Sequence, residues 1–112
     1  KAKVYYSQFS ILEALWVTAK IAKKGRIDQD RVEEGLNSIM ESARYERIIE
    51  DSKVFSDSLK LHLKGHRDMI DNILYAYSVR HDLKFLTLDS ELKNFIQEKG
   101  LKNPLITPEE IT

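Results

Sequence analysis

Helical segments alternate with short β-prone stretches along this chain, and that alternation limits the folds it can adopt. Apolar residues recur at steps of three and four in five helical segments, which begin near Ser7, Asp28 or Asp30, Ser52, Asp68 and Asp89. Residues 45–49, 84–88 and 104–107 are short enough, and apolar enough, to form strands. Because parallel strands need crossover helices between them, this order predicts an α/β fold with a parallel sheet.

The composition of the 112 residues is typical of one globular domain. Lys and Arg number 18, as do Asp and Glu, so the net charge is zero, which excludes nucleic-acid binding through overall charge alone. Cysteine is absent, which excludes disulfides and thiolate zinc sites. The longest apolar run is residues 73–77 and no secretory signal is visible, so we expect a cytoplasmic protein without a membrane span.

Three acidic residues lie near predicted helix starts. Asp89 follows a predicted strand and precedes a helix, Asp71 lies in the first turn of the preceding helix, and Glu13 lies in the first turns of the opening helix. In parallel α/β sheets, ligands gather where strands end and helices begin. Three carboxylates repel one another unless a cation neutralises them, and such hard oxygen ligands suit Mg²⁺ or Mn²⁺. The pattern therefore raises the hypothesis of a divalent metal site that handles a phosphodiester.

Each of these acids also has an ordinary structural interpretation. Ser10 and Glu13 form a capping-box pattern, and Asp68 and Asp89 are good helix N-caps. An acid in the first turn, such as Asp71, offsets the helix dipole. From the residues alone, the structural and the metal-binding interpretations both stay open.

The C-terminal half of the chain resembles the PIN-domain nucleases. Residues 71–78 read D-N-I-L-Y-A-Y-S, residues 85–89 read F-L-T-L-D, and Asp71 and Asp89 are 18 positions apart, as suits that family. Residues 7–13, S-Q-F-S-I-L-E, are similar to the family segment that carries an acid on a helix. The resemblance implies a three-layer α/β fold with a central parallel sheet flanked by helices.

The same resemblance implies an activity and its site. PIN domains bind Mg²⁺ or Mn²⁺ through several acidic residues and cleave RNA. Many small members are VapC-like toxins whose active site an antitoxin protein blocks. By position, Glu13, Asp71 and Asp89 take the catalytic, metal-binding roles. Thr87 takes a supporting role through its hydroxyl, and Asp68 is a nearby acid that we expect to cap the helix.

The chain departs from the family pattern at its start. The family carries its first acid at the end of a first strand, but the twelve residues before Glu13 include neither Asp nor Glu. We therefore expect the first strand and first acid to be missing from this chain, within a single, N-terminally incomplete domain. The alternative function is a PIN-like module that binds RNA or protein with weak catalysis or none.

Four other features have a functional and a structural interpretation. His62 and His66 have the spacing of helical zinc ligands, but we expect both to face solvent. Trp16 could stack on bases, but its place on the apolar stripe favours the core. The basic cluster at residues 20–26 is expected to be a solvated helix end. The first two helices are amphipathic, and we predict that they form a homodimer interface.

Overall fold

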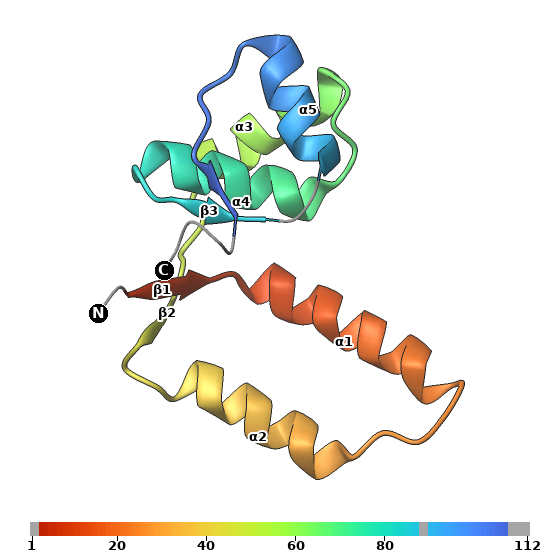
Figure 1. The fold of residues 1–112 in the computed structure, drawn as a ribbon. Helices are drawn as coiled ribbons and strands as arrows, with labels where there is room; N and C mark the ends of the chain where they lie inside the picture. The colour runs from red at the N-terminus through yellow and green to blue at the C-terminus, as the bar shows by residue number, and fades with distance from the viewer. Residues whose placement is uncertain (1–2, 88–89, 108–112) are drawn as a thin grey trace. The chain divides into compact units, whose positions relative to one another are not determined.

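The computed structural model describes residues 3–87 and 90–107 and divides the chain into two compact units, Lys1–Ile49 and Glu50–Thr112 (Figure 1). The units are described separately below. Among the described residues, no helix is both long and apolar enough to cross a lipid bilayer.

The first unit is a pair of parallel strands joined by two helices. Strand β1 (Val4–Tyr6) leads into α1 (Gln8–Ala22), and α2 (Gln29–Met40) leads into β2 (Tyr45–Arg47). The strands pair in parallel with Val4 opposite Tyr45 and Tyr6 opposite Arg47. Backbone hydrogen bonds from Val4 to Arg44 and from Ile48 to Tyr6 close the ladder at its two ends. The helical hairpin is therefore the crossover that a parallel pair requires.

The start of α1 differs from the capping-box interpretation. The Ser7 hydroxyl accepts a hydrogen bond from the Phe9 N–H at 3.1 Å, so the helix begins directly after the strand. Ser10 already lies inside the helix, and Glu13 lies in its second turn. The prediction that Ser10 and Glu13 cap this helix was wrong. The Ser7 hydroxyl satisfies the Phe9 N–H, and the Ser7 carbonyl accepts from the N–H groups of Ser10 and Ile11. Asp28, one of the two predicted caps, is the N-cap of α2.

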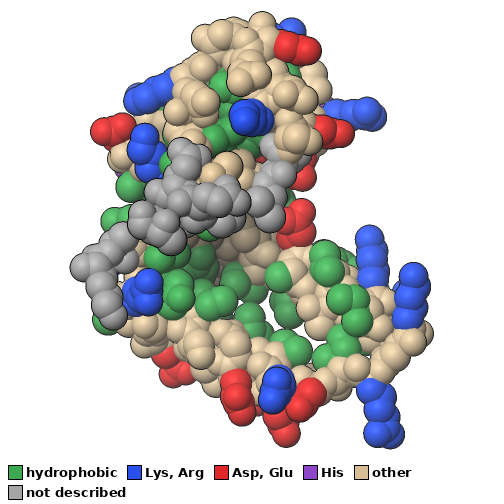
Figure 2. Space-filling view, in the orientation of Figure 1, with side chains coloured by type: hydrophobic (Ala, Val, Ile, Leu, Met, Phe, Trp, Pro, Cys, Tyr) green, Lys and Arg blue, Asp and Glu red, His purple; other side chains and the backbone are tan. Residues whose placement is uncertain are grey.

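The apolar side chains of α1 are exposed. No side chain of α1 is buried, and Trp16 is 64% exposed, so the prediction that it packs in the core was wrong. The physical reason is that α1 and α2 stand apart around a cavity of about 380 Å³, so neither covers the other. Figure 2 shows hydrophobic side chains gathered along this hairpin; those of α1 are Leu12, Leu15, Trp16, Val17 and Ile21.

The second unit contains three helices and a second parallel pair. Helix α3 (Ser52–Leu63) packs against α4 (Met69–Arg80), and α5 (Ser90–Lys99) connects β3 (Phe85–Leu86) to β4 (Leu105–Ile106). Asp51, one residue before the predicted Ser52, caps α3 by accepting from the Val54 N–H, and this bond lowers the pKa of the Asp51 carboxyl. Gly65 directly follows the C-cap of α3 with φ at +121°, a conformation that favours glycine.

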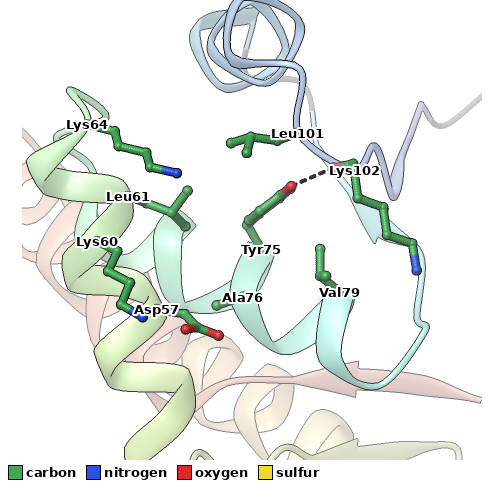
Figure 3. Close-up of a pocket in the computed structure, with 9 residues that line it drawn as sticks. All are labelled: Asp57, Lys60, Leu61, Lys64, Tyr75, Ala76, Val79, Leu101 and Lys102. Carbon is green, nitrogen blue, oxygen red and sulfur yellow. Dashed lines mark hydrogen bonds between the residues drawn. The ribbon is translucent and has the colours of Figure 1, made fainter.

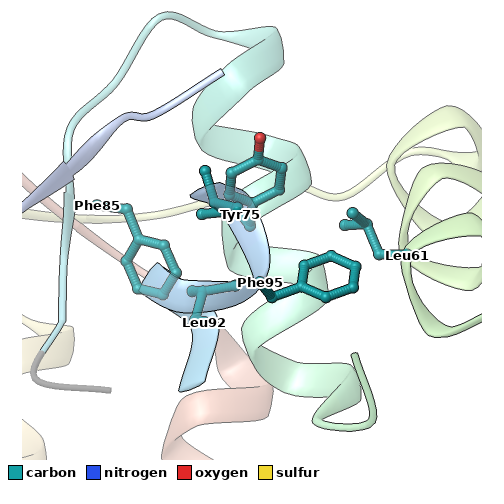
Figure 4. Close-up of a cluster of buried hydrophobic side chains, with 6 residues drawn as sticks. Leu61, Tyr75, Phe85, Leu92 and Phe95 are labelled. Carbon is teal, nitrogen blue, oxygen red and sulfur yellow. The ribbon is translucent and has the colours of Figure 1, made fainter. Parts of the chain in front are cut away.

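A cluster of buried apolar side chains holds the second unit together. It joins one residue of α3, one of α4 and three of α5 to the first residue of β3 (Figure 4): Leu61, Tyr75, Leu92, Phe95, Ile96 and Phe85. Leu92 is completely buried, and Ile96 is nearly so. Because α4 is held on both sides by this cluster and by α3, its first turn is anchored to the unit.

The chain has the α/β fold predicted from the sequence, with short parallel strands connected by helices. The expected parallel pairing is confirmed for both pairs. Within residues 3–87 and 90–107 the pairs form two separate two-stranded sheets, one in each unit. The β1 and β3 strands therefore each have one partner in the described part of the chain.

We predict that Leu92→Ala lowers the free energy of unfolding by about 3 kcal/mol, because it leaves a cavity at the centre of the cluster. The neighbouring exposed substitution Lys93→Ala is the control and changes it by less than about 0.5 kcal/mol. Urea denaturation followed by circular dichroism measures both. Equal stability of the two variants would contradict the assigned core.

Candidate functional site: acids at helix and strand ends

Asp71 lies in the first turn of α4, as predicted, and its backbone is held by a cap. The Asp68 carboxylate accepts a hydrogen bond from the Asp71 N–H at 3.1 Å, and the Asp68 carbonyl accepts one from the Asn72 N–H at 3.0 Å. The prediction that Asp68 caps this helix is confirmed. Asp71 is half-buried in this first turn, beside the positive end of the helix dipole.

The residue after Asp71 makes a contact that the sequence did not predict. The amide nitrogen of Asn72 donates to the His66 carbonyl at 2.9 Å, so its oxygen faces the His66 ring, whose Nδ1 lies 2.7 Å away. An amide oxygen is only an acceptor, so Nδ1 carries a proton and donates it. Both residues are buried, and the His66 ring lies tilted against Phe95 of α5 at 5.3 Å between centroids.

The prediction that His66 faces solvent was therefore wrong, whereas His62 is exposed as expected. The physical reason is that the turn at Gly65 carries His66 out of α3 and folds it back onto α4. Within the described residues, His62 and His66 belong to no group of three or more His, Asp or Glu side chains that could hold a metal ion. The sequence signal for this contact was Asn72 itself, which falls on the same helix stripe as the buried Tyr75 and Ala76.

Thr87 and Asp89 belong to the segment between β3 and α5. Thr87 directly follows β3, is half-buried, and extends the ladder through its N–H to the Ile106 carbonyl at 3.3 Å. It therefore lies at the carboxyl end of a parallel strand, where α/β folds place their ligands. Asp89 lies outside the described residues, and its position in the site stays a prediction.

Glu13 is an exposed residue of α1 in the first unit, while Asp71 and Thr87 belong to the second. Their convergence on one metal stays a prediction. Within the described ranges, no group of three or more acidic or histidine side chains stands close enough to hold a metal ion. The donors that the prediction names are all carboxylates, which is the chemistry that Mg²⁺ and Mn²⁺ require.

A cavity of about 260 Å³ lies elsewhere in the second unit, between α3, α4 and the α5–β4 connection (Figure 3). Its apolar lining includes Tyr75, whose hydroxyl donates to the Lys102 carbonyl at 2.5 Å; burial raises the pKa of this phenol. At its edge, Asp57 and Arg80 form an ion pair at 2.7 Å, which raises the pKa of Arg80. Asp71, the predicted metal ligand that the structure describes in this unit, does not line this cavity.

The chain matches the sequence profile of a known protein family. The sequence profile of the PIN domain matches residues 1–96, a span that contains Glu13, Asp71, Thr87 and Asp89 and crosses the boundary between the two units. Searches of curated proteins and of solved structures found no match.

We predict that Asp68→Ala lowers the free energy of unfolding by about 1 kcal/mol, because the Asp71 N–H loses its acceptor. Asp68→Ser is the matched control, since a serine hydroxyl caps nearly as well, and it stays within a few tenths of a kcal/mol of the parent. Thermal and urea unfolding measure the difference. Equal losses in both variants would show that the cap contributes nothing.

Proposed function

Because the chain belongs to the PIN-domain family, we propose that it is a metal-dependent endoribonuclease with Glu13, Asp71 and Asp89 as its metal ligands. The observation that carries the proposal is the span of the family match, which includes all three acids and Thr87. Two local placements support it: Asp71 stands in the capped first turn of α4, and Thr87 stands at the end of β3.

In this proposal each residue has a defined task. The carboxylates of Glu13, Asp71 and Asp89 hold Mg²⁺ or Mn²⁺ through oxygen atoms. When bound, the metal supplies Lewis-acid activation of the phosphodiester and of the attacking water. The Thr87 hydroxyl donates a hydrogen bond into the same pocket, and Asp68 keeps the first turn of α4 in shape through its cap.

The neutral net charge agrees with a nuclease that holds its substrate through a local metal. A chain with 18 basic and 18 acidic residues has no excess of positive charge for the RNA backbone. A divalent ion at the acids would supply the missing attraction for phosphate at one point. We extend the proposal to a cytoplasmic, VapC-like toxin whose antitoxin partner covers the acids.

The alternative function is a PIN-like binding module with little or no catalysis. The observation that favours it is that, within the described residues, no group of three or more acidic or histidine side chains stands close enough to hold a metal ion. Measurements of metal binding and of RNA cleavage on the same protein distinguish the two functions.

We predict that Mn²⁺ broadens the amide NMR signals around Glu13, Asp71 and Asp89 in one titration, because all three would share the ion. Asp71→Asn and Glu13→Gln each lower the Mn²⁺ affinity about tenfold or more, since a neutral amide is a weak ligand for a hard cation. Asp68→Ser is the control and leaves the affinity unchanged. In parallel, RNA cleavage by the parent stops on addition of EDTA and is lost in Asp89→Asn.

Three results would count against this proposal. Broadening near Asp71 without broadening near Glu13 would place the two acids in different sites. Equal cleavage by the parent and by Asp89→Asn would assign the activity to a contaminant. Mn²⁺ binding without any cleavage would favour the binding module.

We also propose a homodimer through α1 and α2. Helix α1 exposes apolar side chains along its length, with Trp16 the largest of them (Figure 2). Burying such a surface against a second copy would remove it from water at about 25 cal/mol per Å².

We predict that the parent dimerises with rising concentration in sedimentation equilibrium, and that Trp16→Lys shifts the chain to monomer. Phe55→Lys is the control, because it also replaces an exposed aromatic residue but lies on α3. A parent that sediments as a monomer at every concentration would refute the interface. An equal shift in both variants would show that the effect is not specific to α1.

A further inference from the structure

His66 and Asn72 form a closed pair of hydrogen bonds around the start of α4. The Asn72 side chain receives the Nδ1 proton of His66 at 2.7 Å and donates to the His66 carbonyl at 2.9 Å. Asn72 is completely buried and His66 is 5% exposed, so water competes little for either bond. The segment before α4 is thereby tied to the first turn of the helix.

Asp71 stands between this pair and the helix cap. On one side, Asp68 accepts from the Asp71 N–H. On the other, Asn72 is covalently next to Asp71 and is held by His66. First turns of helices fray readily because their N–H groups have no partner within the helix. Two anchors on either side of Asp71 suppress that motion.

The same histidine also contacts α5. Its ring lies against Phe95 with 5.3 Å between centroids and 51° between planes. Phe95 is a member of the buried cluster, and α5 is the helix that follows Asp89 in the sequence. One imidazole therefore links the helix that carries Asp71 with the helix that comes after Asp89.

We propose that His66 and Asn72 are positioning residues, which fix Asp71 in the orientation that metal binding requires. This inference rests on the proposed metal-dependent function, and it adds two residues that touch neither metal nor substrate. Residues that orient a metal ligand without touching the metal commonly contribute about ten- to a hundredfold to metal affinity.

Stability alone does not account for a polar pair at this place. Asn72 lies on a stripe of α4 that continues with the buried Tyr75 and Ala76 and the half-buried Val79. Replacing both members of a buried hydrogen-bonded pair by apolar groups of similar shape is often nearly neutral for stability. Hydrogen bonds are directional, whereas apolar contacts allow small rotations. The pair therefore adds a defined orientation at the residue next to Asp71.

The test compares Mn²⁺ affinity with fold stability in matched variants of the chain. Asn72→Ala removes the pair, and the double variant His66→Phe with Asn72→Leu replaces it by apolar packing. Tyr75→Phe is the control, because it also removes a buried side-chain hydrogen bond to a backbone carbonyl, one turn further along α4. Free Mn²⁺ is measured by electron paramagnetic resonance well below the unfolding temperature of each variant.

We expect Mn²⁺ affinity to fall about tenfold or more in Asn72→Ala and in the double variant, and to stay unchanged in Tyr75→Phe. The unfolding temperature measures stability separately from Mn²⁺ affinity. If Asn72→Ala does not fold, the affinity of the double variant tests the positioning role. Unchanged affinity in a folded variant that lacks the pair, with affinity lost in Asp71→Asn, would overturn this inference alone. Unchanged affinity in Asp71→Asn would overturn the proposed function, and the positioning role with it.

Discussion

The packing of α4 against α3 and α5 is the constraint on which the second unit depends. Leu61, Tyr75 and Phe95 bring the three helices to one apolar centre, and Leu92 fills it completely. Because α4 is fixed in this way, the position of its first turn is fixed as well. Asp71 then needs only local restraints, which the Asp68 cap and the His66–Asn72 pair provide.

The first unit is organised differently. Its order comes from the β1–β2 ladder and from side-chain caps at Ser7 and Asp28, while α1 and α2 bury no side chain completely. Hydrogen bonds and caps can define helices without a packed core, but they leave apolar surface in contact with water. The exposed apolar face of α1 is therefore the surface on which the proposed homodimer is based.

The chain belongs to the PIN-domain family, and the family match includes the local features of both units. The family match spans both units, and the strands form two separate pairs in the described residues. The single domain expected from the sequence stays a prediction. The carboxylates that the proposal names repel one another, so a bound cation would offset that repulsion as well as supply its chemistry.

The sequence by itself determined the α/β class, the order of the helices and of the later strands, and the capping of α4 by Asp68, because these depend on periodicity and on contacts within one turn of chain. It also indicated the acids at the helix starts and their family. It did not predict strand β1 (Val4–Tyr6). Only the tertiary structure decided that Trp16 is exposed and that His66 is buried against Asn72 and Phe95. Those outcomes depend on which segments, distant in sequence, pack against each other. The residue pattern of one helix does not identify the element that packs against it.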